Sequence, residues 1–163
     1  MAQPTGYTRA QIGLHWITLL LVALQYLLHD AIAAAWEAMA TGAEVVFHPL
    51  IGQHVAVGAL VAVLTFVRLG LRFSHGAPPP PASEHAALKA VAHATHWAFY
   101  ALLILMPVSG AIAWFNGVAG AAQAHNVMKL ALLALIALHV LAALAHQFVF
   151  KTNLMARMKT PAA

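Results

Sequence analysis

Histidine is the side chain that offers the most chemistry in this sequence. The 163 residues include 11 histidines, four acidic residues and no cysteine. Three of these histidines, His125, His139 and His146, lie in a stretch made almost entirely of Ala, Leu and Val, separated by fourteen and then seven residues. At 3.6 residues per turn, these intervals place all three on one face of a helix. Neutral imidazole is a common metal ligand, so the pattern indicates a metal or metallocofactor site that uses no thiolate.

The remaining composition is that of a membrane protein. Hydrophobic residues make up 63% of the chain and charged residues only 7%, whereas a soluble domain usually carries about 25% charged residues. A transmembrane helix needs roughly 20 mostly apolar residues, and the sequence predicts four, at about residues 12–33, 51–71, 86–115 and 124–150. We therefore expect an all-α membrane protein in which residues 1–163 form one four-helix transmembrane domain. The first apolar segment is too long for a signal peptide, and we expect it to be retained.

The basic residues predict the orientation in the membrane. Cytoplasmic connections carry an excess of Lys and Arg. The charged residues in and beside the first connection are all acidic, whereas most basic residues flank the other side of the predicted spans: Arg9, Arg68, Arg72, Lys89, Lys151, Arg157 and Lys159. Both termini and the second connection are thus expected in the cytoplasm of a bacterium, and the first and third connections in the periplasm. The net charge of +4 follows this membrane pattern and gives no reason to expect nucleic-acid binding.

Depth in the membrane sorts four histidines into two levels. The first and fourth helices run in opposite directions, so His15 and His139 both lie toward the cytoplasmic side. His54 and His125 lie near the start of the second and fourth helices, at the periplasmic level. At ~1.5 Å per residue, His125 and His139 differ in depth by about 21 Å. Two layers of paired imidazoles within a four-helix bundle suit two haems with two axial histidines each.

Other side chains compete for these places. His29 and His48 could serve at the periplasmic level, and His93 and His96 at the cytoplasmic level. Zinc is an alternative to haem, but it needs three or four ligands that converge at one depth. A transporter for metal ions or protons lined by histidines would need no haem at all.

Further polar residues are candidates for substrate or cofactor contacts. Lys129 follows His125 by one helical turn and could attract an anion, pair with a haem propionate or extend to the membrane surface. Haem propionates and a quinone both need donors, and those expected at the cytoplasmic level are Arg68, Arg72, His93, His96 and His146. No catalytic residue is assigned, and the candidates for that role are Lys129, His96 and His146.

Four segments resemble the bacterial cytochrome b561 family, specifically its superoxide oxidase branch. They are "LHW", "HVAVGALVAVLTFVRLGLR", "AHATHWAFYALLILMPVSG" and "LHVLAALAHQFVFKTNLMARM". The resemblance implies a multi-pass cytochrome of the bacterial inner membrane with two non-covalent b-type haems. It implies axial ligation by His15 and His139 for the cytoplasmic haem, and by His54 and His125 for the periplasmic haem. It also implies an oxidoreductase that takes electrons from superoxide at the periplasmic side and passes them to ubiquinone.

The third connection departs from this pattern. Here it reads "NGVAGAAQA", whereas relatives have a much longer segment near the outer haem. A short connection would leave the outer haem open to a docked protein, and the acidic first connection works against steering of an anion. The alternative function is therefore a quinone-linked cytochrome b subunit that receives electrons from a periplasmic dehydrogenase or hydrogenase.

Overall fold

The computed structural model describes residues 4–162 and is almost entirely helical. In chain order the elements are α1 (Arg9–Leu27), α2 (Asp30–Thr41), α3 (Pro49–His75), α4 (Ala86–Asn116), α5 (Ala119–Phe148) and the short 3-10 helix η1 (Leu154–Met158). Four of them, α1, α3, α4 and α5, are long and apolar enough to cross a membrane. This confirms the predicted all-α fold with four transmembrane helices.

The first predicted span was drawn too long. It was expected over residues 12–33, but α1 ends at Leu27 and a separate helix, α2, begins at Asp30. Nδ1 of His29 lies 3.0 Å from the carbonyl oxygen of Tyr26, so the ring satisfies a carbonyl that the helix no longer uses. Asp30 lies in the first turn of α2, where a carboxylate is stabilised by the helix dipole.

Two other boundaries also differ from the prediction. α3 continues to His75 instead of ending at residue 71, and α5 begins at Ala119 instead of 124. The alanine-rich stretch 119–124 has high helix propensity and extends α5 toward its N-terminus. Gly117, with φ of 67°, ends α4 in the left-handed conformation that glycine adopts readily. The third connection is therefore only Gly117 and Val118.

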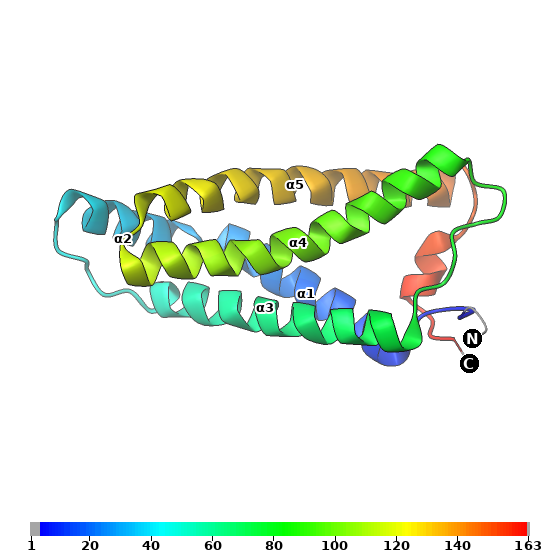
Figure 1. The fold of residues 1–163 in the computed structure, drawn as a ribbon, viewed down its shortest axis with the longest axis horizontal. Coiled ribbons are helices and arrows are strands. Elements are labelled where there is room, and N and C mark those ends of the chain that lie inside the picture. The colour runs from blue at the N-terminus through cyan, green and yellow to red at the C-terminus, as the bar shows by residue number, and fades with distance from the viewer. Residues whose placement is uncertain (1–3, 163) are drawn as a thin grey trace.

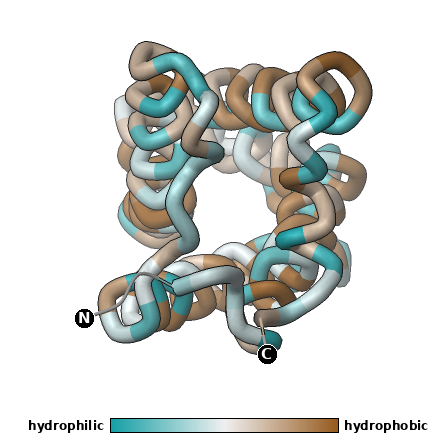
Figure 2. The backbone as a smooth tube through the Cα atoms, turned by 90° about the vertical axis from the view of Figure 1, so that its right-hand side faces the viewer, coloured by the Kyte–Doolittle hydropathy of each residue, from teal (hydrophilic) through white to brown (hydrophobic). Residues whose placement is uncertain are grey.

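The long helices run lengthwise and give the molecule two distinct ends (Figure 1). At one end lie α2 and the connection to α3; we call this the α2 end. At the other, both ends of the chain meet η1 and the connection between α3 and α4; we call this the termini end. Figure 2 looks at the termini end and shows the helices arranged around a central axis.

One buried side chain from each long helix forms the centre of the bundle. Val22, Val61, Leu103 and Leu132 make this cluster. Leu132 lies midway in sequence between His125 and His139, so the cluster separates the two levels at which those histidines lie. Most other large apolar side chains of these helices are exposed, as expected where lipid replaces water around a bundle.

Close packing joins only some of the helix pairs. In the part of the chain that the structure describes, α1 packs closely on α3, α3 on α4, and α4 on α5, while α2 packs on α3 and η1 on α5. Neither α1 and α5 nor α3 and α5 are among these closely packed pairs. These two helix pairs, α1 with α5 and α3 with α5, carry the histidines described next.

Candidate functional site

The first histidine pair lies toward the α2 end, where α3 faces α5. The ring centroids of His54 and His125 are 6.5 Å apart, and the ring planes make an angle of 62°. Nδ1 of His125 lies 2.9 Å from the carbonyl oxygen of Met106 in α4. A carbonyl only accepts hydrogen bonds, so Nδ1 carries the proton and Nε2 presents its lone pair. This is the tautomer that a metal-ligating histidine needs.

A glycine makes the position of His125 possible. A Cβ atom placed on Gly110 of α4 would lie 3.2 Å from both Cε1 and Nδ1 of His125. Such contacts are closer than the van der Waals distance of about 3.5–4.0 Å. The missing side chain at residue 110 therefore leaves the room in which the ring reaches the Met106 carbonyl one turn away.

The second pair lies toward the termini end, where α1 faces α5. The ring centroids of His15 and His139 are 6.3 Å apart, with an angle of 58° between the planes. His96 also approaches His139, at 5.8 Å between centroids, and Phe99 packs edge-on against His139 at 5.4 Å. Nδ1 of His96, however, is held 2.6 Å from the carbonyl oxygen of Ala92 in its own helix. The structure thus brings the rings of both predicted histidine pairs close together, and His96 lies beside the second pair.

Both pairs have the spacing that two axial ligands of one metal require. A bond of about 2.0 Å from each nitrogen to the metal, with about 1.1 Å from nitrogen to ring centre, separates two ring centres by about 6.2 Å. The observed values are 6.3 Å and 6.5 Å. α5 is not among the close packing partners of α1 or α3, so the helices that carry the facing rings are held together mainly through other helices. The donor set and its surroundings therefore fit haem.

The environment fits zinc less well. Zinc sites need three or four ligands at one point. Within residues 4–162 there is no group of three or more His, Cys, Asp or Glu side chains placed to hold a metal ion. Two facing imidazoles suit a metal that takes its other ligands from a macrocycle.

Two arginines and several aromatic rings gather at the termini end. The guanidinium of Arg68 lies 5.9 Å from the ring centroid of Tyr100, and that of Arg72 lies 5.6 Å from Trp97. Within residues 4–162, neither arginine forms a salt bridge with a carboxylate. Tyr7 of the N-terminal segment belongs to the same cluster; burial raises the pKa of its hydroxyl, and the nearby Arg72 opposes that effect. The cluster offers cations and a phenol to an anion or a carbonyl.

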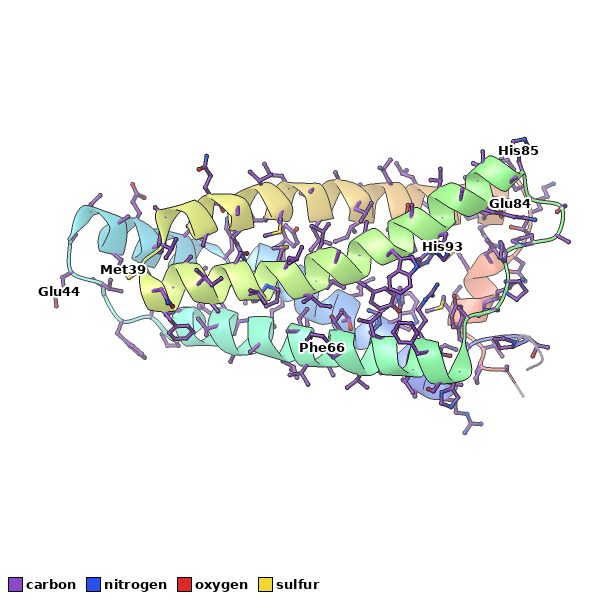
Figure 3. All side chains as sticks on the ribbon, viewed as in Figure 1. Met39, Glu44, Phe66, Glu84, His85 and His93 are labelled. Atoms are coloured by element: carbon purple, nitrogen blue, oxygen red, sulfur yellow. The ribbon has the colours of Figure 1, made fainter. Side chains whose placement is uncertain are left out.

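The other predicted site residues have separate places. Nε2 of His93 accepts a hydrogen bond from Nε1 of Trp97 at 2.9 Å, and the labelled His93 points toward the aromatic side chains in Figure 3. Lys129 is half-buried one turn from His125, and its carbonyl accepts the hydroxyl of Tyr26 at 2.6 Å. His146 belongs to neither pair and contacts Glu84, with 3.1 Å between Nε2 and Oε1.

The two histidines that competed for the outer level lie at helix ends. Nδ1 of His48 accepts the backbone N–H of Leu50 at the start of α3, over 3.2 Å. Nδ1 of His29 lies at the start of α2, 3.3 Å from Oδ1 of Asp30. Neither is part of the pair formed by His54 and His125.

Four residues with direct contacts were missed in the sequence. They are Met106, Gly110, Tyr7 and Glu84. Met106 and Gly110 lie in the segment "MPVSG", where a glycine inside a long apolar helix was the available signal. Glu84 had a signal as well, because it is the one acidic residue outside the region from Asp30 to Glu44.

Comparisons with known proteins identify the family of the chain. The fold and the facing imidazoles define a helical membrane protein built to hold haem. The family model of prokaryotic cytochrome b561 matches residues 6–161. A cytochrome b562 of Cereibacter sphaeroides is 38% identical over 163 residues, which cover 99% of each chain. A probable superoxide oxidase CybB of Yersinia pestis is 30% identical over 176 residues, covering 93% of this chain and 94% of that protein.

The chain belongs to the prokaryotic cytochrome b561 family. It is a multi-pass membrane cytochrome that binds b-type haem and transfers electrons.

Proposed function

We propose that this cytochrome holds two b-type haems and carries electrons across the bacterial inner membrane from superoxide to ubiquinone. The observation that carries the proposal is the pair of facing imidazoles at each of two levels, 6.5 Å and 6.3 Å between ring centroids. His54 and His125 would hold the haem at the α2 end, and His15 and His139 the haem at the termini end. When bound, haem iron accepts and releases one electron at a time.

The orientation follows from the basic residues. With the termini end in the cytoplasm, seven of the eight Lys and Arg residues flank the cytoplasmic side, and the α2 end faces the periplasm. His54 and His125 would then hold a haem on the periplasmic side, where electrons enter, and His15 and His139 would hold a haem on the side of Arg68 and Arg72, where electrons leave.

The residues around each pair have defined tasks in this scheme. The Met106 carbonyl fixes the tautomer and ring orientation of His125, as an outer hydrogen-bond partner does for metal-ligating histidines. Arg68 and Arg72 have no carboxylate partner in the described residues, so they are available for haem propionates or a quinone carbonyl. His96, beside His139, is a further candidate for the quinone site. Lys129 supplies a positive charge one turn from His125, where an anion would arrive.

Ligand replacement tests the haem scaffold. The wild type should contain two haems per chain, extractable without breaking a covalent bond. His54→Ala should remove the outer haem or convert it to a high-spin form and leave the inner spectrum intact, and His139→Ala should do the reverse. His29→Ala and His48→Ala are matched controls because both histidines lie at helix ends. A ratio near one haem per chain, or loss of the outer haem in either control, would contradict the assignment.

Rapid mixing with superoxide tests the donor. Superoxide should reduce the outer haem directly, electrons should reach a soluble ubiquinone analogue, and superoxide dismutase should abolish the reaction. Lys129→Glu should slow the first step, whereas Lys129→Arg should retain it, and added salt should change the wild-type rate by screening. Slow reduction that is indifferent to the dismutase would refute superoxide as donor.

A protein donor is the second candidate. Asp30, Glu37 and Glu44 give the α2 end an acidic character, and the connection between α4 and α5 is only Gly117 and Val118. Acidic groups repel superoxide, while a short connection leaves the outer haem open to a docked partner. Under this reading, the chain is an electron-transfer subunit for a periplasmic dehydrogenase or hydrogenase, and haem reduction requires that protein.

A further inference from the structure

Glu84 and His146 form a buried ion pair at the termini end that neither histidine pair uses. Nε2 of His146 lies 3.1 Å from Oε1 of Glu84, with 9% of the glutamate side chain and 16% of the histidine side chain exposed. Nδ1 of the same ring lies 3.0 Å from Oγ1 of Thr152. A glutamate is rarely buried so far unless it is paired. Both ring nitrogens of His146 are therefore engaged, one of them by a carboxylate.

The position of Glu84 in the molecule is distinctive. It lies next to the start of α4, at the opposite end from Glu44 (Figure 3). The other three acidic residues fall between residues 30 and 44, so Glu84 is the one carboxylate among the basic residues of the termini end. His146 follows His139 by seven residues on α5, which places it on the same helix face, about 10 Å nearer the termini end. The ion pair thus lies between the end of the bundle and the inner histidine pair.

Two basic side chains hold the connection on which Glu84 lies. Nζ of Lys89 donates to the carbonyl of Ala82 at 3.2 Å, and Nη1 of Arg157 donates to the carbonyl of Pro79 at 2.7 Å. These two cations fix the connection that carries Glu84, and neither forms a salt bridge with it in the described residues.

A neighbouring amide gives an independent sign of bound water. Oε1 of Gln147 is buried and has no hydrogen-bond partner in the described part of the chain. Buried polar atoms are normally satisfied by protein or by ordered water. Gln147 directly follows His146 in α5, so this unsatisfied atom belongs to the same turn of the helix.

We propose that Glu84 takes up protons from the cytoplasm and that His146 passes them inward to the quinone bound near the inner histidine pair. This inference rests on the proposed reduction of ubiquinone. One quinone takes two electrons, delivered singly through the haems, and two protons, and becomes the quinol. Each proton leaves the Glu84 and His146 pair and is replaced from cytoplasmic water, so charge and atoms balance without another reactant. A carboxylic acid and an imidazole are suited to this transfer near neutral pH.

The test compares two oxidants of the reduced cytochrome. A water-soluble ubiquinone analogue needs protons to be reduced, whereas ferricyanide takes one electron and no proton. Glu84→Gln should slow oxidation by the quinone roughly tenfold to a hundredfold, a modest loss for removal of a positioned acid. It should leave oxidation by ferricyanide and the haem spectrum unchanged. Glu84→Asp should recover part of the quinone rate, and Glu37→Gln, at the α2 end, is the matched control.

Each outcome bears on the inference. Slowing with quinone alone, together with a solvent deuterium isotope effect on the wild-type quinone reaction and none with ferricyanide, supports it. A full quinone rate in Glu84→Gln overturns the inference and leaves the proposed function standing. Equal slowing with both oxidants shows a structural role and also overturns it. A wild type whose haems are not oxidised by quinone overturns the proposed function together with the inference.

Discussion

Substituting Gly110 should selectively weaken the binding of the haem that we propose His125 holds. The Cβ of Gly110→Ala would lie 3.2 Å from Cε1 and Nδ1 of the ring, which is about 0.5 Å closer than a comfortable contact. If the ring moves away by that amount, its 2.9 Å hydrogen bond to the Met106 carbonyl lengthens beyond the usual range of about 2.7–3.2 Å. Loss of such an outer partner typically lowers metal affinity about 10- to 100-fold, which is about 1.4–2.7 kcal/mol.

Haem transfer to an excess of apomyoglobin measures this change. Wild type should release its haems slowly, and Gly110→Ala should show one phase that is about 10- to 100-fold faster and one that is unchanged. Gly110→Val should lose the outer haem during purification because its methyl groups reach further into the ring. Gly70→Ala is the matched control, since a Cβ at that glycine meets nothing within 4 Å. Full haem content and unchanged release in both Gly110 variants would refute the steric argument for His125.

Two further predictions concern the inner haem and the core. Arg68→Gln removes a cation near the proposed inner haem, which should favour the oxidised state and lower the haem midpoint potential by about 40 mV, equivalent to about 1 kcal/mol. Arg68→Lys should retain the potential. An unchanged potential in the Gln variant would exclude an electrostatic interaction between Arg68 and the haem. Leu132→Ala opens a cavity at a side chain that is 3% exposed and should lower the free energy of unfolding in detergent by about 2–3 kcal/mol. Replacing the neighbouring Leu133, which is 49% exposed, by Ala should lower the free energy of unfolding by under about 1 kcal/mol. Equal decreases in the two variants would show that Leu132 is not a core residue.

The helical fold and the facing histidines could be predicted because they depend on length and direction. Each long apolar stretch must cross the membrane, and a rise of about 1.5 Å per residue fixes the relative depth of histidines on helices of known direction. His15 and His139 were therefore paired without knowledge of helix packing, and the structure brings their rings to 6.3 Å. Their role as axial ligands remains a prediction.

Features that depend on tertiary contacts were not predicted. The stretch "DAIAAAWEAMAT" that forms α2 contains no proline or glycine, so the break at His29 was marked only by the adjacent polar residues His29 and Asp30. The contact between Gly110 and His125 joins different helices, and the ion pair between Glu84 and His146 joins residues 62 positions apart. No local periodicity records such contacts, which form only when the helices have packed.

The termini end is closed by the last segment of the chain, and this has a consequence for biogenesis. Nε1 of Trp16 donates to the carbonyl of Met158 across 142 residues, at 2.8 Å, and the backbone of Ala162 donates to the carbonyl of Tyr7 at 3.0 Å. During translation, α1 enters the membrane long before its partners emerge from the ribosome. Under the proposed orientation, the inner haem would be loaded from the cytoplasmic side while that end is open, and residues 154–162 would close over it afterwards. Deleting them should speed exchange of the inner haem in the finished protein, and an unaltered exchange rate would exclude a closing role.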